Sequence, residues 1–274
     1  MTVFEALRRW RRDRVLKRAE IPEPLWREAC AALPFLSLYG ADERARLRTL
    51  VVLFLDAKTI VGARGHQVTP LQRVIIAIEA CVLILNLDLG WYDDFEGVIV
   101  YPDQFFPGWE YEDEAGVVHR QEGPLAGEAM PRGPVILSWP DVAASADWEA
   151  AGMNLVIHEF AHKLDMRSGE ANGCPPLPPG ISPRAWAETF GAAYTHFSAR
   201  VALGRHTQID PYAAESPAEF FAVLAELFFV DPLCFRGEYR GLYELYAQFF
   251  GQNPALRAAA RDEGAAPGSG ASAA

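Results

Sequence analysis

Residues 154–166, NLVIHEFAHKLDM, constrain the fold of this chain most, because they combine two histidines and a glutamate with an apolar surface. If the segment is an α-helix, His158 and His162 project from the same side and can bind one metal ion. Glu159 lies about 100° round the helix from His158, so its carboxylate can reach a metal-bound water without becoming a ligand. Catalytic zinc sites use three protein ligands and leave a fourth position for water. We therefore expect the fold to bring a third ligand to this helix.

The alternative is that His158 and His162 are structural residues of an ordinary buried helix. Their apolar neighbours fit either interpretation, since both require a packed helix; these neighbours are Leu155, Val156, Ile157, Phe160, Ala161 and Leu164. The chain has six histidines, and composition alone would produce the HExxH spacing in about one sequence in 100 of this length. The motif therefore favours a metal site.

No third histidine follows at the spacing HExxHxxGxxH, because Asp165 stands in place of the glycine and Ser168 in place of the last histidine. We expect Asp165 either to hydrogen-bond the helix or a nearby loop, or to contact a metal-binding histidine. The downstream carboxylates that remain as candidate ligands are Glu170, Glu188, Glu215, Glu219 and Glu226.

Glu219 and Glu226 stand out among these candidates. They are seven residues apart, on nearly the same face of the apolar segment 216–230, where an unpaired carboxylate would be costly. Glu219 has a second explanation, because Ser216, Pro217 and Glu219 match a capping box at the start of a helix. Spacing and burial therefore leave both glutamates open as the third ligand.

Helical periodicity dominates the chain. It predicts helices at 23–33, 42–57, 69–87, 146–166, 183–201, 216–230 and 242–251. Runs of β-branched and aromatic residues predict strands at 97–102 and 134–139, with a hairpin or excursion at 111–120. We expect one α+β domain over residues 1–256, predominantly helical with a small β-sheet. Its helical part covers about 1–90 and its catalytic part about 91–256, and a disordered tail follows at 257–274.

Charge and apolar pattern exclude other classes. A net charge of −11 repels nucleic acid, so we expect no direct nucleic-acid binding. The segment 8–18 carries seven basic residues against one acid, which predicts a solvated helix face or a contact with a partner or membrane surface. The most apolar run, 74–87, is interrupted by Glu79 and too short for a transmembrane segment. Four widely spaced cysteines and the lack of a visible signal peptide predict a cytoplasmic protein.

Three blocks, HEFAHKLDM, GEANGCPPLP and ESPAEFFAVLAELFF, carry a specific resemblance to a known family. Together with the upstream segments 87–105 and 133–142, they resemble the Mlc titration factor A family of bacterial zinc peptidases. The resemblance covers about residues 20–250, and it is more specific around the two histidines than in the N-terminal helices.

The resemblance implies a zincin-like metallopeptidase fold and a role for each site residue. His158, His162 and Glu219 would bind Zn²⁺, and Glu159 would be the base that takes a proton from the attacking water. A similarity to the catalytic domain of anthrax lethal factor implies that Tyr212 lies beside the metal and donates a hydrogen bond to the developing oxyanion.

The implied activity is that of a cytoplasmic zinc-dependent aminopeptidase acting on peptide substrates, which also binds a glucose-type (Mlc-like) transcriptional repressor. Strand 134–139 would pair with an extended peptide through its backbone, as in other zincins. The alternative is mainly a regulatory, repressor-binding protein with secondary peptidase activity. The intact glutamate of HExxH favours catalysis, because a scaffold has no need for it. A serine hydrolase is not supported, since no GxSxG motif is present.

Overall fold

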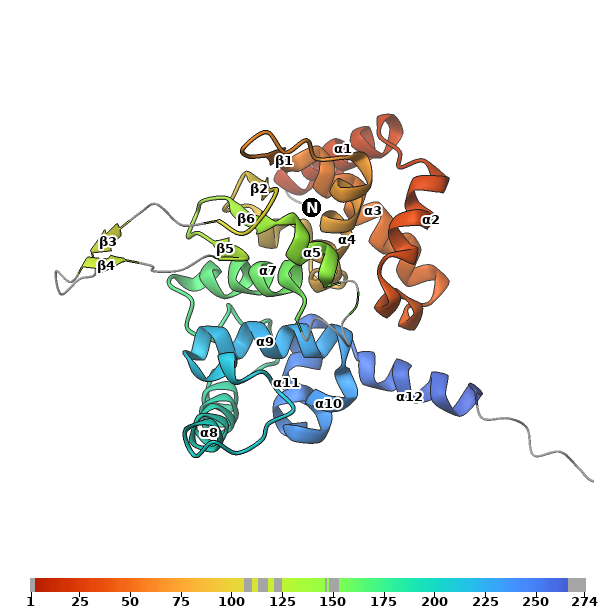
Figure 1. Ribbon diagram of the computed structural model, residues 1–274. Coiled ribbons are helices and arrows are strands. Elements are labelled where there is room, and N and C mark those ends of the chain that lie inside the picture. The colour runs from red at the N-terminus through yellow and green to blue at the C-terminus, as the bar shows by residue number, and fades with distance from the viewer. Residues whose placement is uncertain are drawn as a thin grey trace, which may run out of the picture.

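Helices surround a small mixed sheet in the computed structural model of the chain (Figure 1). The structure describes residues 3–105, 110–112, 118–120, 125–145, 147 and 153–265. Its architecture confirms the prediction of an α+β, predominantly helical fold with a small β-sheet.

The N-terminal part is mostly helical and contains α1 (Val3–Arg18), α2 (Glu23–Ala31), η1 (Pro34–Leu38), α3 (Ala41–Ala57) and α4 (Pro70–Leu83). The expected helical part over about residues 1–90 is interrupted by a strand at Thr59–Gly62, between α3 and α4. Thr69 caps α4, because its hydroxyl accepts a hydrogen bond from the Gln72 N–H at 3.2 Å. Almost every side chain of α4 is buried, which agrees with a buried helix in the apolar run 74–87. The basic segment 8–18 lies on α1, and its described cationic side chains are all exposed, as in a solvated helix face.

The sheet has four strands in the order β1–β2–β6–β5. They are β1 (Thr59–Gly62), β2 (Gly97–Tyr101), β5 (Gly127–Ala129) and β6 (Val135–Ser138). β2 is parallel to both β1 and β6, whereas β5 is antiparallel to β6. A separate antiparallel pair, β3 (Glu110–Glu112) with β4 (Val118–Arg120), forms the hairpin that we predicted at 111–120.

The order of the strands corrects one expectation. The segment 134–139 contains β6, whose two edges pair with β2 and β5 and whose four residues are all buried. β6 therefore has no free backbone edge for a peptide substrate. Among the described strands, β5 lies at this edge of the sheet instead.

Helices return after the sheet: α5 (Trp139–Ala144), α7 (Leu155–Asp165), α8 (Pro183–Ala202), α9 (Pro217–Val230), α10 (Pro232–Glu238), α11 (Arg240–Phe250) and α12 (Pro254–Ala265). Short 3₁₀ turns connect some elements: η2 (Leu89–Tyr92), η3 (Met166–Ser168) and η4 (Pro211–Ala214). α7 lies between the sheet and α9 (Figure 1) and also packs against α4. All of its 11 residues are buried. No helix among the described residues has the length and apolar character needed to cross a lipid bilayer.

The start of α7 differs from the predicted helix at 146–166. α7 begins at Leu155, because the side-chain oxygen of Asn154 accepts a hydrogen bond from the Ile157 N–H at 2.9 Å and caps the first turn. Residues 146 and 148–152 lie outside the described residues.

The C-terminal segment differs as well, since the expected tail from residue 257 is helical in α12 as far as Ala265. The Arg257 guanidinium hydrogen-bonds the Glu43 carboxylate and lies 4.6 Å from the centre of the Tyr39 ring. These contacts with residues far away in the sequence stabilise α12, and alanine, which is frequent in this segment, has a high helix propensity. Residues 266–274 lie outside the described residues.

Candidate metal centre

Three side chains from two helices converge at the middle of the molecule. His158 and His162 lie on α7 and Glu219 lies on α9, and one potential ligand atom from each falls within 4.8 Å of the others. The Nε2 atom of His158 lies 3.0 Å from a Glu219 carboxylate oxygen, and that of His162 lies 3.5 Å from the other. Both histidines are buried. The predicted histidine pair and one of the two candidate glutamates are therefore brought together.

The donor set fits a divalent metal such as zinc. The two Nε2 atoms are only 3.1 Å apart, which is stable only if a proton or a cation lies between their lone pairs. Burial lowers the pKa of His158, but hydrogen bonds to Glu219 and Glu226 outweigh burial and raise this pKa well above its ordinary value. The site therefore attracts positive charge. Two imidazoles and one carboxylate are also the ligands of known catalytic zinc sites.

Glu219 reaches the histidines from the first turn of α9. The Ser216 hydroxyl accepts a hydrogen bond from the Glu219 N–H at 3.1 Å, so serine caps the helix as the sequence predicts. The Glu219 carboxylate points at the imidazoles, and the hydrogen bonds from both histidines hold its pKa below the ordinary value despite partial burial. The capping interpretation and the metal interpretation are therefore compatible.

Glu226, about two turns further along the same face of α9, contacts the other nitrogen of the His158 ring. Its carboxylate lies 2.7 Å from His158 Nδ1 and also accepts the backbone N–H of Asn154. If Nδ1 carries the proton that it donates to Glu226, Nε2 presents a free lone pair toward Glu219 and His162. Glu226 thus holds the His158 ring in place and lies outside the cluster of potential ligands.

Glu159 is buried, with 5% of its surface exposed, and it faces strand β5. A Cβ atom placed on Gly127 of β5 would lie 2.5 Å from a Glu159 carboxylate oxygen and 2.6 Å from the Leu155 side chain. A larger residue at position 127 would therefore have to displace the Glu159 carboxylate and the Leu155 side chain, whereas glycine lets the edge strand pass this close to them. Burial raises the pKa of Glu159 to about 7, although the neighbouring His158 and His162 oppose the shift.

Tyr212 lies in η4, just before α9, with its ring centre 6.1 Å from that of His158. The residue is 45% exposed, so it stands at the solvent side of the cluster. Asp210 fixes the turn, because its carboxylate accepts the Tyr212 N–H at 2.9 Å. Burial and the nearby Glu219 raise the pKa of Tyr212 above its ordinary value. The phenol is therefore protonated and able to donate a hydrogen bond beside His158 and Glu219.

Asp165, at the end of α7, takes the first of the two roles that the sequence left open. One of its carboxylate oxygens accepts the backbone N–H groups of Asn172 and Gly173, both at 2.7 Å. Gly173 has φ +80°, and its carbonyl accepts the Trp186 indole N–H at 2.9 Å. Asp165 therefore secures the loop after α7. The Nδ1 atom of His162 is buried without a hydrogen-bond partner among the described residues.

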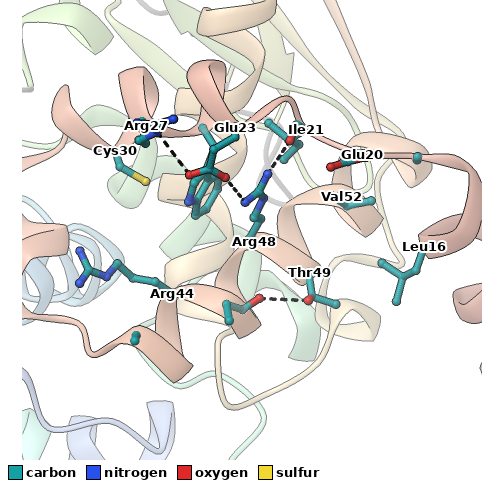
Figure 2. A pocket seen from close by; sticks show the side chains of 14 residues that line it. Leu16, Glu20, Ile21, Glu23, Arg27, Cys30, Arg44, Arg48, Thr49 and Val52 are labelled. Carbon is teal, nitrogen blue, oxygen red and sulfur yellow. Dashed lines mark hydrogen bonds and ion pairs between the residues drawn. The ribbon is translucent and has the colours of Figure 1, made fainter.

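A cavity of about 670 Å³ lies elsewhere, between α1, α2 and α3 (Figure 2), and none of its lining residues belongs to the metal cluster. Two of its charged groups are already paired with each other: Arg48 binds Glu23 at 2.5 Å, and it also binds the Ile21 carbonyl at 2.6 Å and stacks over Trp26. Burial raises the pKa of the Cys30 thiol, which disfavours the reactive thiolate. We therefore locate the chemistry at α7 and α9.

The chain is similar to known proteins over most of its length. The chain matches the family described as Glucose-regulated metallo-peptidase M90 over residues 7–251. It is 39% identical to the Mlc titration factor A of Escherichia fergusonii over 246 residues, which cover 88% of this chain and 92% of that protein. It is 36% identical to the protein of the same name from Klebsiella pneumoniae over 250 residues, or 90% of this chain and 92% of that protein. The corresponding Salmonella arizonae protein is 38% identical over 250 residues, or 90% of this chain and 97% of that protein.

Proposed function

Because the chain belongs to the glucose-regulated metallo-peptidase M90 family, we propose that it is a zinc-dependent peptidase. The convergence of His158, His162 and Glu219 carries the proposal, since these three side chains could hold one metal ion. Three protein ligands leave a fourth position for water, as in catalytic zinc sites. A bound zinc ion would act as a Lewis acid for the attacking water and the scissile carbonyl.

In this proposal Glu159 is the general base. It accepts a proton from the attacking water and passes that proton to the amine that leaves. Its position supports the role, because it is adjacent in sequence to His158 but faces β5, outside the cluster of potential ligands. Burial that raises the pKa of Glu159 to about 7 makes the free carboxylate a stronger base than an exposed glutamate. A bound dication would lower this pKa again.

The substrate would be an extended peptide that pairs with β5. This strand lies at the edge of the described sheet, and its Gly127 passes directly beside Glu159. Backbone pairing with an edge strand gives affinity that is independent of side-chain sequence. The finer activity of an aminopeptidase is part of the proposal and rests on the resemblance to the Mlc titration factor A family. So does a cytoplasmic location, which the four free cysteines support.

Tyr212→Phe should lower kcat for peptide hydrolysis by about 10²-fold, the typical cost of losing one oxyanion donor. Phenylalanine keeps the ring beside His158 and removes only the hydroxyl, so zinc content should not change. Steady-state kinetics together with metal analysis would check both statements. An unchanged kcat would remove Tyr212 from the mechanism while leaving the zinc site in place.

Metal removal tests the function as a whole. The purified chain should contain about one zinc per molecule and hydrolyse peptide or aminoacyl-anilide substrates. Dialysis against a chelator should abolish hydrolysis, and one equivalent of zinc should restore it. Hydrolysis that persists in metal-free protein would contradict the proposal, as would zinc-loaded protein that cleaves none of a broad peptide set.

A second role as a repressor-binding protein is favoured by one observation, the name Mlc titration factor A that the curated relatives carry. We propose that this chain also binds an Mlc-like transcriptional repressor. The exposed basic residues of α1 are a candidate contact surface. Binding of such a repressor by the Glu159→Gln variant, with hydrolysis lost, would separate the two activities.

A further inference from the structure

One buried glutamate outside the cluster of potential ligands, Glu79, has no role in the chemistry described above. Glu79 lies on α4, its side chain has no exposed surface, and its helix neighbours are almost all apolar. One of its carboxylate oxygens accepts a hydrogen bond from the Asn154 side-chain amide at 2.7 Å. The other is buried without a hydrogen-bond partner among the described residues. Burying a carboxyl group among apolar side chains costs free energy, which must be offset by the interactions that the group makes.

Asn154 connects this glutamate to the metal centre. Its side-chain NH₂ group donates to Glu79, and its side-chain oxygen accepts the Ile157 N–H at 2.9 Å. Its backbone N–H donates to Glu226, and its backbone carbonyl accepts the His158 N–H at 3.0 Å. Asn154 is fully buried. If one of these partners were removed, a water molecule could take over its hydrogen bond only if a cavity opened beside Asn154.

The hydrogen bonds form one continuous path across three helices. It runs from Glu79 on α4 to Asn154 before α7, then to Glu226 on α9, and ends at His158 Nδ1, 2.7 Å from Glu226. Glu79 and Asn154 are 75 residues apart in sequence, and Asn154 and Glu226 are 72 apart. The path therefore joins the N-terminal helical part to the two helices that carry the potential ligands.

We propose that Glu79 is a positioning residue of the metal centre, which acts by fixing the side-chain amide of Asn154. An amide can be turned by 180°, and two partners select the observed orientation: the acceptor oxygen of Glu79 holds the NH₂ group, and the Ile157 N–H holds the oxygen on the first turn of α7. With the first turn fixed, the Asn154 N–H meets Glu226, and Glu226 holds the His158 ring in the orientation that presents Nε2.

The inference rests on the proposed function, because its consequence appears at the proposed ligand His158. Burial raises the pKa of Glu79 to about 8, so the carboxyl group is largely neutral near pH 7. A neutral carboxyl still offers an acceptor oxygen to Asn154. Glutamine offers one as well, which makes Glu79→Gln the conservative variant and Glu79→Met the variant of similar size that removes the acceptor.

The test measures zinc affinity by competition with a chromogenic chelator, and the visible spectrum of the cobalt-substituted full chain. Glu79→Met should weaken zinc binding by about tenfold, the low end of the effect of losing an outer partner of a metal ligand, and should alter the cobalt spectrum. Glu79→Gln should restore both to near wild type. Cys81→Ala is the matched control, since Cys81 is equally buried, lies on the opposite side of α4 and is outside the path. It should lower the melting temperature without changing zinc affinity.

A second variant covers the possibility that Glu79→Met does not fold. Asn154→Ser keeps a capping oxygen for α7, but it removes the amide that anchors this turn to Glu79 on α4. The first turn, and with it the backbone N–H that meets Glu226, is then no longer held against α4. This variant should also weaken zinc binding and alter the cobalt spectrum.

In the double variant Glu79→Met/Glu226→Gln, the loss of affinity should be smaller than the product of the single losses, because both substitutions break the same path.

Failure of this inference can be distinguished from failure of the proposed function. If neither Glu79→Met nor Asn154→Ser changed the zinc affinity or the cobalt spectrum, the role of Glu79 would be overturned. The zinc site itself would remain intact. Additive losses in the double variant would also overturn the role of Glu79. Wild-type protein that binds no zinc at all would instead overturn the proposed function.

Discussion

Glu159→Gln should lower peptide hydrolysis by about 10²- to 10⁴-fold, the usual contribution of a general base, and leave the zinc content at one per chain. Glutamine has nearly the same shape, so it fits the narrow space beside Gly127 of β5. It cannot accept the proton of the attacking water. Because Glu159 lies outside the cluster of potential ligands, the metal should stay bound while the reaction stops. Initial rates and metal analysis on the same preparation would check both.

A matched control is Glu170→Gln, which also removes one carboxylate close to the motif but at an exposed position of the loop after α7. Its hydrolysis rate and zinc content should equal those of the wild type. If Glu159→Gln with full zinc hydrolysed peptides at the wild-type rate, a different group would have to be the base. The repressor-binding alternative would then become the better account of the chain.

The helices and the histidine pair could be predicted from the sequence because their signals are local. A spacing of four residues places His158 and His162 on one face of any α-helix, whatever surrounds it. Thr69 and Ser216 cap α4 and α9 as their positions before proline predict. Asn154 is also a residue type that commonly caps a helix, and it caps α7. We did not predict this cap, because we predicted a helix that begins earlier, at residue 146.

The strands that define the substrate edge could not be predicted in this way. β5 has the sequence Gly-Glu-Ala, which has no strand preference, and it is a strand only because it pairs with β6. β1 has four residues and pairs with a partner almost 40 positions away, Thr59 with Gly97. The order β1–β2–β6–β5 depends on such distant pairings, so the segment 134–139 gave no sign that it would be internal.

The choice between Glu219 and Glu226 also depends on three-dimensional contacts. Both lie on one face of α9, and each contacts His158. They differ in which nitrogen of that ring they reach, and this is set by how α7 and α9 cross. The role of Glu79 could not be predicted for the same reason, because its partner Asn154 is 75 residues away in the sequence. Its only sequence signal is a carboxyl group within an apolar helix.

Removal of a proposed ligand should have the largest effect on the metal. His158→Ala should weaken zinc binding by more than the roughly 100-fold that marks the loss of an outer partner, and hydrolysis should fall with it. Glu219→Gln should weaken binding more than Glu226→Gln, because Glu219 faces the Nε2 atoms of both histidines whereas Glu226 contacts Nδ1 of one. Zinc titration followed by competition with a chelator would rank the variants.

Thermal unfolding provides an independent measurement of the same ligand set. A metal that binds only the folded chain raises its melting temperature with increasing concentration, so zinc should stabilise the wild type and fail to stabilise His158→Ala. His206→Ala is the matched control, since this histidine is exposed and distant in sequence from the motif, and it should respond to zinc as the wild type does. Stoichiometric zinc at wild-type affinity in His158→Ala would refute the assignment. A greater loss in Glu226→Gln than in Glu219→Gln would instead move the third ligand to Glu226, because the glutamate that binds the metal must be the one whose carboxylate cannot be replaced.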